Sequence, residues 1–166
     1  MYRVVRVRDG AQARNLYLSG QGKRVTDIAI AQPNDAELDI IHTALAQSYW
    51  SPGIPRETVA RGFRNSLVVL ARDNEGALIG WARLVTDKAT FAWLCDVFVL
   101  PEHQGRGIAR ALVRAFREHA ELQNLRRWIL GTRDAHGVYA ALGFEPDAAP
   151  ERLMEIRNPA PYGIPV

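Results

Sequence analysis

The chain has 166 residues and a net charge of +3, with 48% hydrophobic and 23% charged residues. This length fits one domain, and the composition is ordinary for a soluble globular protein, which excludes a disordered chain. The first residues alternate Val with Arg and contain no apolar signal segment, so we expect a cytoplasmic protein without a membrane span. Cys95 is the single cysteine, so no internal disulfide can form, and neither it nor the four histidines show a metal-ligand spacing.

Positive charge concentrates at the N-terminus. Residues 1–24 carry six basic residues against one acidic residue, a net charge of +5, whereas the remainder carries 15 against 17, a net charge of −2. A near-neutral body with a basic arm differs from a nucleic-acid-binding fold with a basic face, so no nucleic acid is expected. We predict a basic extension at 1–24, either solvated or added as an edge strand, followed by a single domain at 25–166.

A strand and two helices are predicted first. The strand, TDIAIAQP, begins at Thr26, and Asn34 or Asp35 supplies the N-cap of the first helix. A link at 48–55, which contains two aromatic residues and two prolines, ends this helix and precedes a second short one.

Three β-rich runs follow and predict an antiparallel meander over 66–72, 77–87 and 90–100. A helix from Gly105 to about Glu121 then returns the chain to a parallel strand by a right-handed crossover. The last predicted elements are that strand at 127–130, a helix ending at Gly143 and a strand at 152–157. The expected fold class is α/β (α+β), a mixed, mostly antiparallel twisted sheet of about six to seven strands with helices on both faces.

The segment QGRGIA, from Gln104 to Ala109, joins the meander to the long helix. Two glycines expose the N–H groups of the turn, and the helix N-terminus adds unpaired donors and its positive dipole end. Such a turn binds anions, most usefully phosphate, although a surface loop that only caps a helix uses the same residues. A P-loop would need Lys and then Ser or Thr where Ile108 and Ala109 stand, and a dinucleotide fingerprint would need a small residue at Arg110.

The turn matches the pattern Gln/Arg-x-x-Gly-x-Gly/Ala through Gln104, Gly107 and Ala109. It thereby resembles the GNAT superfamily of acetyl-CoA-dependent N-acetyltransferases. A second segment supports the resemblance, because Tyr139 to Phe144 is similar to the family's Tyr-x-x-x-Gly-Phe. The resemblance implies the GNAT fold and an enzyme that moves an acetyl group from acetyl-CoA to a primary amine of a small molecule or protein, by direct attack in a ternary complex.

The resemblance also implies where acetyl-CoA lies. The CoA arm would contact the strand before the turn, the pyrophosphate would lie on the turn with charge added by Arg106 or Arg110, and a backbone N–H of Val97 or Phe98 would face the thioester oxygen. The family often has Asn seven residues before the tyrosine, where this chain has Thr132. The expected cofactor-binding residues are Val97, Phe98, Val99, Gln104, Gly105, Arg106, Gly107, Ile108, Ala109 and Thr132.

Two residues are candidates for catalysis. The ammonium of the acceptor must lose a proton before attack, and Asp96 is the one carboxylate within the apolar strand that can receive or relay it. An ion pair with an arginine is the alternative for Asp96. The resemblance assigns Tyr139 to the departure of the thiolate, with packing as its alternative. Asp134 and His136 are weaker candidates, because Asp134 is well placed as a helix N-cap.

The acceptor is less well defined. In the family, the link between the first two helices commonly borders the acceptor pocket, so Tyr49 and Trp50 are expected to contact substrate, with core packing as the alternative. No acidic cluster marks a polyamine site. The sequence leaves open a homodimer, and also a non-catalytic acyl-CoA sensor or interaction module on the same fold.

Overall fold

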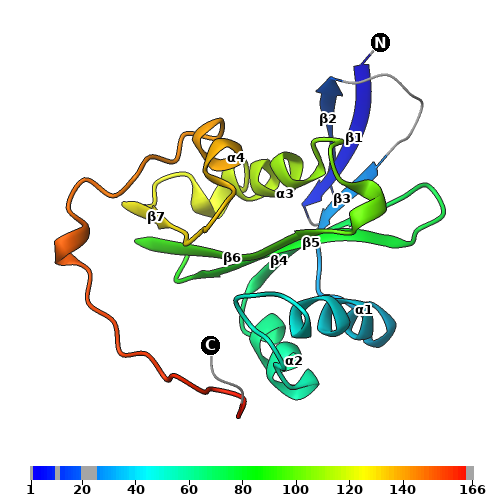
Figure 1. Ribbon diagram of the computed structural model, residues 1–166. Helices are drawn as coiled ribbons and strands as arrows, with labels where there is room; N and C mark the ends of the chain where they lie inside the picture. Colours follow the sequence, from blue (N-terminus) through cyan, green and yellow to red (C-terminus); the bar gives the residue numbers. More distant parts are fainter. Residues whose placement is uncertain (1, 10–11, 20–25, 164–166) are drawn as a thin grey trace.

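The computed structural model describes residues 2–9, 12–19 and 26–163, which form a mixed sheet with helices on both faces (Figure 1). The seven strands lie in the order β2-β1-β3-β4-β5-β6-β7. The pairs β1–β3 and β6–β7 are parallel and all other neighbours are antiparallel. The strands are β1 Tyr2–Asp9, β2 Gln12–Ser19, β3 Thr26–Ile30, β4 Leu67–Arg72, β5 Leu78–Thr86, β6 Phe91–Val99 and β7 Arg127–Ile129. The predicted fold class is confirmed.

The helices are divided between the two faces of the sheet. In Figure 1, α1 and α2 lie below the sheet, and α3 and α4 lie above it. The helices are α1 Asp35–Ala46, α2 Arg56–Arg64, α3 Ile108–Arg117 and α4 His136–Ala140, and the 3₁₀ turns are η1 Pro101–His103, η2 Ala120–Leu122 and η3 Pro150–Arg152. Within the described residues, none of these helices is long and apolar enough to cross a bilayer.

Each face of the sheet has its own hydrophobic core. Along β4, Val68 and Leu70 pack with α1 and α2, whereas Val69 and Ala71 pack with α3. This alternation follows from the period of two in a strand, and it explains why β4 is apolar throughout. The helices that cover the two faces therefore fix the positions of β4 and of its neighbours.

Asn34 is the N-cap of α1. Its side chain accepts a hydrogen bond from the Glu37 backbone N–H at 2.9 Å, and the Glu37 side chain accepts from the Asn34 backbone N–H at 2.9 Å. The second oxygen of Glu37 accepts from Arg72 Nε at 2.6 Å. This capping box satisfies two helix donors and ties the start of α1 to β4.

The C-terminal part of the chain departs from the prediction. The strand predicted at 152–157 is wrong: η3 covers its start, and the remaining residues form no strand. Met154 and Ile156 alternate as a strand would, yet both are almost fully exposed. An alternating segment forms a strand only when another strand pairs with it, and no described strand pairs with 152–157. The long helix is also shorter than predicted, since α3 ends at Arg117 rather than near Glu121.

The turn after α4 agrees with the prediction. Gly143 has a φ of +86°, and the backbone N–H of Phe144 donates to the carbonyl of Tyr139 at 3.1 Å. This left-handed stop returns the chain toward β7.

The N-terminal segment forms the far edge of the sheet. β1 and β2 are an antiparallel hairpin, and β1 pairs in parallel with β3. Of the two possibilities predicted for residues 1–24, a solvated extension or an added edge strand, this hairpin matches the second. Residues 20–24 lie outside the described residues, and the domain boundary at 24/25 stays a prediction.

Gly80 permits β5 and β6 to approach closely, because a Cβ at this position would lie 2.9 Å from the carbonyl oxygen of Phe98. We expect Gly80→Ala to destabilise the protein by roughly 1–3 kcal/mol, or about 2–12 °C in Tm. Gly62→Ala in α2 is the control, because a Cβ there meets its nearest neighbour at 3.8 Å. Thermal unfolding of both variants checks the prediction, and equal Tm values would contradict it.

Candidate active site

β6 and β7 pair at one end and separate at the other. Phe91–Trp93 pair with Arg127–Ile129, after which β7 ends while β6 continues to Val99. Beyond Trp93, β6 keeps β5 on one edge and, within the described residues, has no strand on the other edge. The separation leaves backbone donors and acceptors of β6 open to a ligand.

Backbone alternation identifies the groups that face this opening. The N–H of Leu100 donates to the carbonyl of Ile79 in β5 at 3.0 Å, so the backbone groups of Val99 point to the opposite edge. The side chain of Gln104 lies there, because its Nε2 donates to the Val99 carbonyl at 3.0 Å. Phe98 pairs with Trp81 and lies two residues before Leu100, so its backbone groups point toward β5, as those of Leu100 do. Of the two predicted thioester donors, this leaves Val97 as the candidate.

A β-bulge in β6 displaces Asp96 from the regular strand. The register shifts between the pairs Trp81/Phe98 and Arg83/Cys95, so that one residue of β5 opposes two residues of β6. Asp96 has a φ of +49°, a left-handed conformation that costs a non-glycine residue about 1 kcal/mol. Its side chain is 12% exposed and lies beside Arg83.

Asp96 is held by two donors from separate segments. Arg83 Nε donates to Oδ2 at 2.6 Å, and Trp50 Nε1 donates to Oδ1 at 3.3 Å. Burial has the largest single effect and lowers the pKa of Arg83, but the charge and hydrogen bond of Asp96, together with Cys95 and Tyr162, outweigh it and raise this pKa above its ordinary value. The ion pair that the sequence left as the alternative is therefore present. Each carboxylate oxygen keeps a second lone pair that an ammonium can use.

The aromatic residues between α1 and α2 connect the bulge to the loop before α4. The rings of Tyr49 and Trp50 meet edge to face at 4.9 Å. The Tyr49 hydroxyl accepts from the backbone N–H of Arg133 at 3.4 Å, and the Arg133 guanidinium lies 3.7 Å from the Tyr49 ring centroid. Tyr49 and Trp50 are 44% and 40% exposed, which excludes core packing for both.

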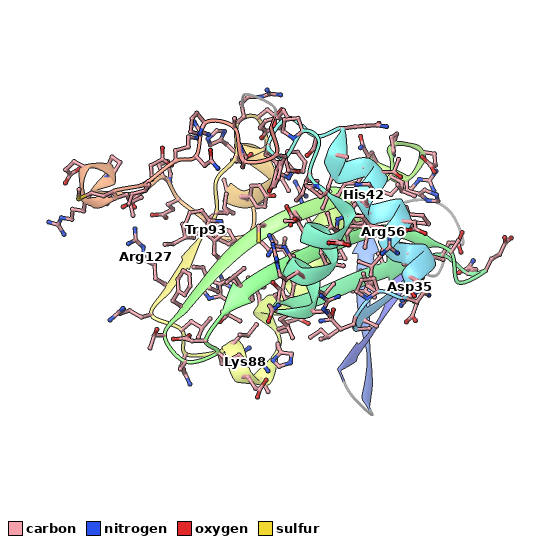
Figure 2. All side chains as sticks on the ribbon, turned by 90° about the horizontal axis from the view of Figure 1, so that it is seen from below. Asp35, His42, Arg56, Lys88, Trp93 and Arg127 are labelled. Carbon is pink, nitrogen blue, oxygen red and sulfur yellow. The ribbon has the colours of Figure 1, made fainter. Side chains whose placement is uncertain are left out.

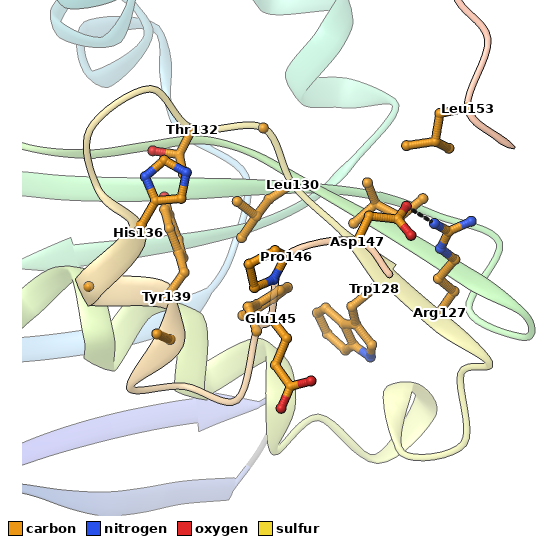
Figure 3. Close-up of a pocket in the computed structure, with 15 residues that line it drawn as sticks. Arg127, Trp128, Leu130, Thr132, His136, Tyr139, Glu145, Pro146, Asp147 and Leu153 are labelled. Carbon is orange, nitrogen blue, oxygen red and sulfur yellow. Dashed lines mark hydrogen bonds and ion pairs between the residues drawn. The ribbon is translucent and has the colours of Figure 1, made fainter. Parts of the chain in front are cut away.

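Tyr139 lies on α4 beside a cavity of about 610 Å³ between α4 and β7 (Figure 3). Burial raises its pKa, and Tyr49 and Asp134 raise it further, so the phenol is protonated at neutral pH. The packing alternative has support too, because the Tyr139 and Phe144 rings meet edge to face at 6.0 Å.

Thr132 caps the turn into α4, since its Oγ1 accepts from the backbone N–H of Ala135 at 3.0 Å. The prediction of Asp134 as this cap is wrong, because the N-cap of α4 is Ala135. Asp134 instead lies 3.6 Å from Arg133, with both side chains 65% exposed. His136 also lines the cavity next to Thr132 (Figure 3).

The glycine turn forms a separate cavity of about 330 Å³ at the N-terminus of α3. Gly105 and Gly107 have φ values of +69° and +78°, and no side chain caps the helix at Gly107. The first N–H groups of α3 are thus available to an anion. The residues that line this cavity are Val99, His103, Gln104, Gly105, Gly107, Ile108, Ala109, Arg110 and Val138.

Arg106 and Arg110 differ in their positions at this turn. Arg106 Nη2 donates to the carbonyl of Glu102 at 2.7 Å, and its Nη1 lies 3.4 Å from His103 Nδ1, so this side chain braces η1. Arg110 lines the cavity. His103 and Val138 line this cavity but were not predicted as site residues. His103 belongs to η1, which the sequence did not predict, and Val138 comes from α4, which no sequence pattern connects to the turn.

Cys95 lies at the bulge but is not an activated thiol, because burial raises its pKa to about 11. Among the described residues, no group of three or more His, Cys, Asp or Glu side chains could hold a metal ion. The candidate site is therefore built from backbone donors, the Asp96–Arg83 pair, aromatic rings and Tyr139.

The Asp96–Arg83 pair can be tested by a double-mutant cycle. Arg83→Met leaves a carboxylate unpaired at 12% exposure, and we expect it to cost about 3 kcal/mol of unfolding free energy. Asn tolerates the left-handed backbone of residue 96, so Arg83→Met with Asp96→Asn removes both charges and should recover at least about 1 kcal/mol. Denaturant unfolding measures these values. Losses that simply add would contradict the pairing.

Comparisons with known proteins agree with this geometry. The acetyltransferase (GNAT) family model matches residues 33–144. A protein of Gibberella zeae that is named as an acetyltransferase is 30% identical over 129 residues, which cover 66% of this chain and 70% of that protein.

Solved structures share the same fold. A GNAT-family protein of Xanthomonas campestris pv. campestris is 40% identical with a TM-score of 0.77, over 87% of this chain and 100% of that one. An aminoglycoside N-acetyltransferase in complex with CoA is 24% identical with a TM-score of 0.59, over 85% of this chain and 99% of that one, a likeness of fold. The resemblance found in the sequence is confirmed. Because the family model covers well over half of its length, the chain belongs to the GNAT family of acetyltransferases.

Proposed function

We propose that this chain transfers the acetyl group of acetyl-CoA to a primary amine by direct attack in a ternary complex. The observation that carries the proposal is the opening between β6 and β7, which lies between an uncapped, glycine-rich helix N-terminus and a bulge that presents Asp96. The first feature suits a pyrophosphate, the opening suits an extended pantetheine arm, and the bulge suits the reacting groups. Release of CoA thiol in the presence of an amine would exclude the alternative, a non-catalytic acyl-CoA sensor.

The pyrophosphate of acetyl-CoA would accept hydrogen bonds from backbone N–H groups between Gly105 and Ala109. Arg110 adds a positive charge at the same cavity, and His103 can add a donor. The pantetheine arm would pair with backbone groups of Val97 and Val99 on this edge, where the Val99 carbonyl also accepts from Gln104. Thr132 accepts a hydrogen bond through Oγ1, and its hydroxyl hydrogen remains able to donate to the arm.

The thioester carbonyl would lie against the Val97 N–H. A single oxyanion donor contributes a factor of about 10²–10³ in kcat. Positioning the amine and thioester in line contributes roughly 7–11 kcal/mol in good cases, so the site needs few reactive side chains. During the reaction, the amine nitrogen forms a bond to the acetyl carbon, and the C–S bond then breaks to release the CoA thiolate.

Proton transfer involves two groups. The acceptor arrives as an ammonium, with an ordinary pKa of about 10.4, and would donate a hydrogen bond to a free lone pair of Asp96 before losing its proton. Tyr139 would donate to the developing thiolate, because its raised pKa keeps the phenol protonated. The nitrogen would lose two protons in all. The first would pass from the ammonium through Asp96 to solvent, and the second, lost after attack, would go to the CoA thiolate, so that ammonium and acetyl-CoA give an N-acetylated amine, CoA thiol and one H⁺.

The anion site is tested at Gly107, whose φ of +78° is tolerated by both Asn and Asp. Gly107→Asp places a negative charge where phosphate is expected, whereas Gly107→Asn adds a side chain of the same shape without charge. We expect the Asp variant to bind acetyl-CoA at least about tenfold more weakly than the Asn variant, or about 1.4 kcal/mol. Calorimetry on both folded variants measures this, and equal affinities would place the pyrophosphate elsewhere.

The role of Tyr139 is tested by Tyr139→Phe, which removes only the hydroxyl. We expect kcat to fall by about 10²–10⁴ with acetyl-CoA affinity nearly unchanged. The pKa of Tyr139 is raised above 10.0, so the donor is present below that pH and is lost above it. On the alkaline side, the wild-type rate should therefore decline only at strongly alkaline pH, and the Phe variant should lack this decline. Both enzymes should slow as the pH falls, because the acceptor amine is then protonated. A kcat within threefold of wild type, with chemistry rate-limiting, would leave Tyr139 as a packing residue.

A further inference from the structure

Two carboxylates of the candidate site each have an arginine partner. Asp96 is bonded to Arg83 at 2.6 Å, and Asp134 is paired with Arg133 at 3.6 Å. Over residues 26–163, no group of three or more His, Cys, Asp or Glu side chains could hold a metal ion. A polyamine or an aminoglycoside carries several ammonium groups, and each needs a carboxylate to repay its desolvation. Asp96, the carboxylate that Arg83 and Trp50 bind, can serve one ammonium.

Aromatic surface is exposed around the same carboxylate. Tyr49 and Trp50 lie in the α1–α2 link, and Trp50 touches Asp96 directly. Trp93 is 46% exposed, and its partner Val85 is 39% exposed. The pairs Val85/Trp93 and Arg83/Cys95 are two residues apart along β5 and β6, so all four side chains share one face of the sheet.

The sheet face that carries Trp93 extends beyond the part covered by α1 and α2. Figure 2, which views the molecule from the side of α1 and α2, shows Trp93 to one side of these helices. The C-terminal tail also reaches this side of the sheet (Figure 1). Tyr162 lies close enough to Arg83 to be among the groups that raise its pKa, after burial, which lowers it, and Asp96, which raises it.

These rings offer a flat ligand two kinds of attraction. Aromatic pairs contribute about 0.5–1.5 kcal/mol beyond the area they bury. An ammonium over an exposed ring gains about 0.5–1 kcal/mol, which holds the acceptor before it loses its proton. A hydroxylated amino sugar would leave its hydroxyl groups unpaired against this apolar surface.

We propose that the acceptor is an arylalkyl monoamine, a primary amine on a short aliphatic arm attached to an aromatic ring. The amine lies at Asp96, and the ring packs against Trp50 and Trp93. This inference rests on the proposed acetyl transfer and goes beyond it by naming the class of acceptor.

The test uses the full chain with acetyl-CoA and three probes: 2-phenylethylamine, spermidine and glucosamine. Release of CoA thiol gives kcat/KM for each amine. We expect 2-phenylethylamine to exceed both other amines by at least about tenfold, or about 1.4 kcal/mol. Trp93→Leu should raise KM for 2-phenylethylamine alone, and Trp93→Phe, which keeps an aromatic ring, should recover part of the loss. The KM for acetyl-CoA is the internal control.

A second measurement separates this inference from the proposed function. With CoA bound, titration of 2-phenylethylamine should quench tryptophan fluorescence in the wild type, and less in Trp93→Leu. Spermidine or glucosamine as the better acceptor would overturn the inference while leaving acetyl transfer intact, as would a Trp93→Leu loss shared by all three amines. Quenching without acetylation of any amine would overturn the proposed function and retain the aromatic-amine site.

Discussion

The bulge in β6 is the constraint on which the candidate site depends. One additional residue in β6 gives Asp96 a left-handed backbone and places it beside Arg83 and Trp50. The bulge also leaves Val97 as the donor available to the opening beside β7. The cost of the left-handed conformation is offset by the ion pair, whose partner lies on the adjacent strand β5. Gly80 lets β5 and β6 pack closely next to the bulge, because a Cβ there would lie too near the Phe98 carbonyl oxygen.

The features proposed to bind acetyl-CoA and those proposed to bind the amine lie on opposite faces of the sheet. The glycine turn and α4 lie on the side of α3, whereas Asp96, Trp50 and the exposed aromatic surface lie on the side of α1 and α2. Such a division lets acetyl-CoA and an amine approach the thioester from opposite sides, as direct attack requires. Tyr49 is the link between the two, because it touches Trp50 and holds the loop before α4 through Arg133.

The sequence predicted the features that are local in the chain. Asn34 as a cap, the glycine turn and the stop at Gly143 depend on neighbouring residues, and all three are present. The partner of Asp96 was not predictable, because the bulge sets which β5 residue faces it. The strand predicted at 152–157 is absent for a related reason: its residues alternate correctly, but within the described residues no strand pairs with them. The cap by Thr132 instead of Asp134 depends on the loop conformation, which composition does not determine.

The central claim is that the acetyl group lies at the bulge and the pyrophosphate lies at the turn. Backbone amide chemical shifts of the isotope-labelled protein, titrated separately with acetyl-CoA and with CoA, test it most directly. Both ligands should shift the amides from Gly105 to Ala109, whereas Val97 should respond more strongly to acetyl-CoA, because only the thioester carbonyl reaches it. If Val97 responds equally to both ligands, or if the amides of the turn do not move, the account is contradicted.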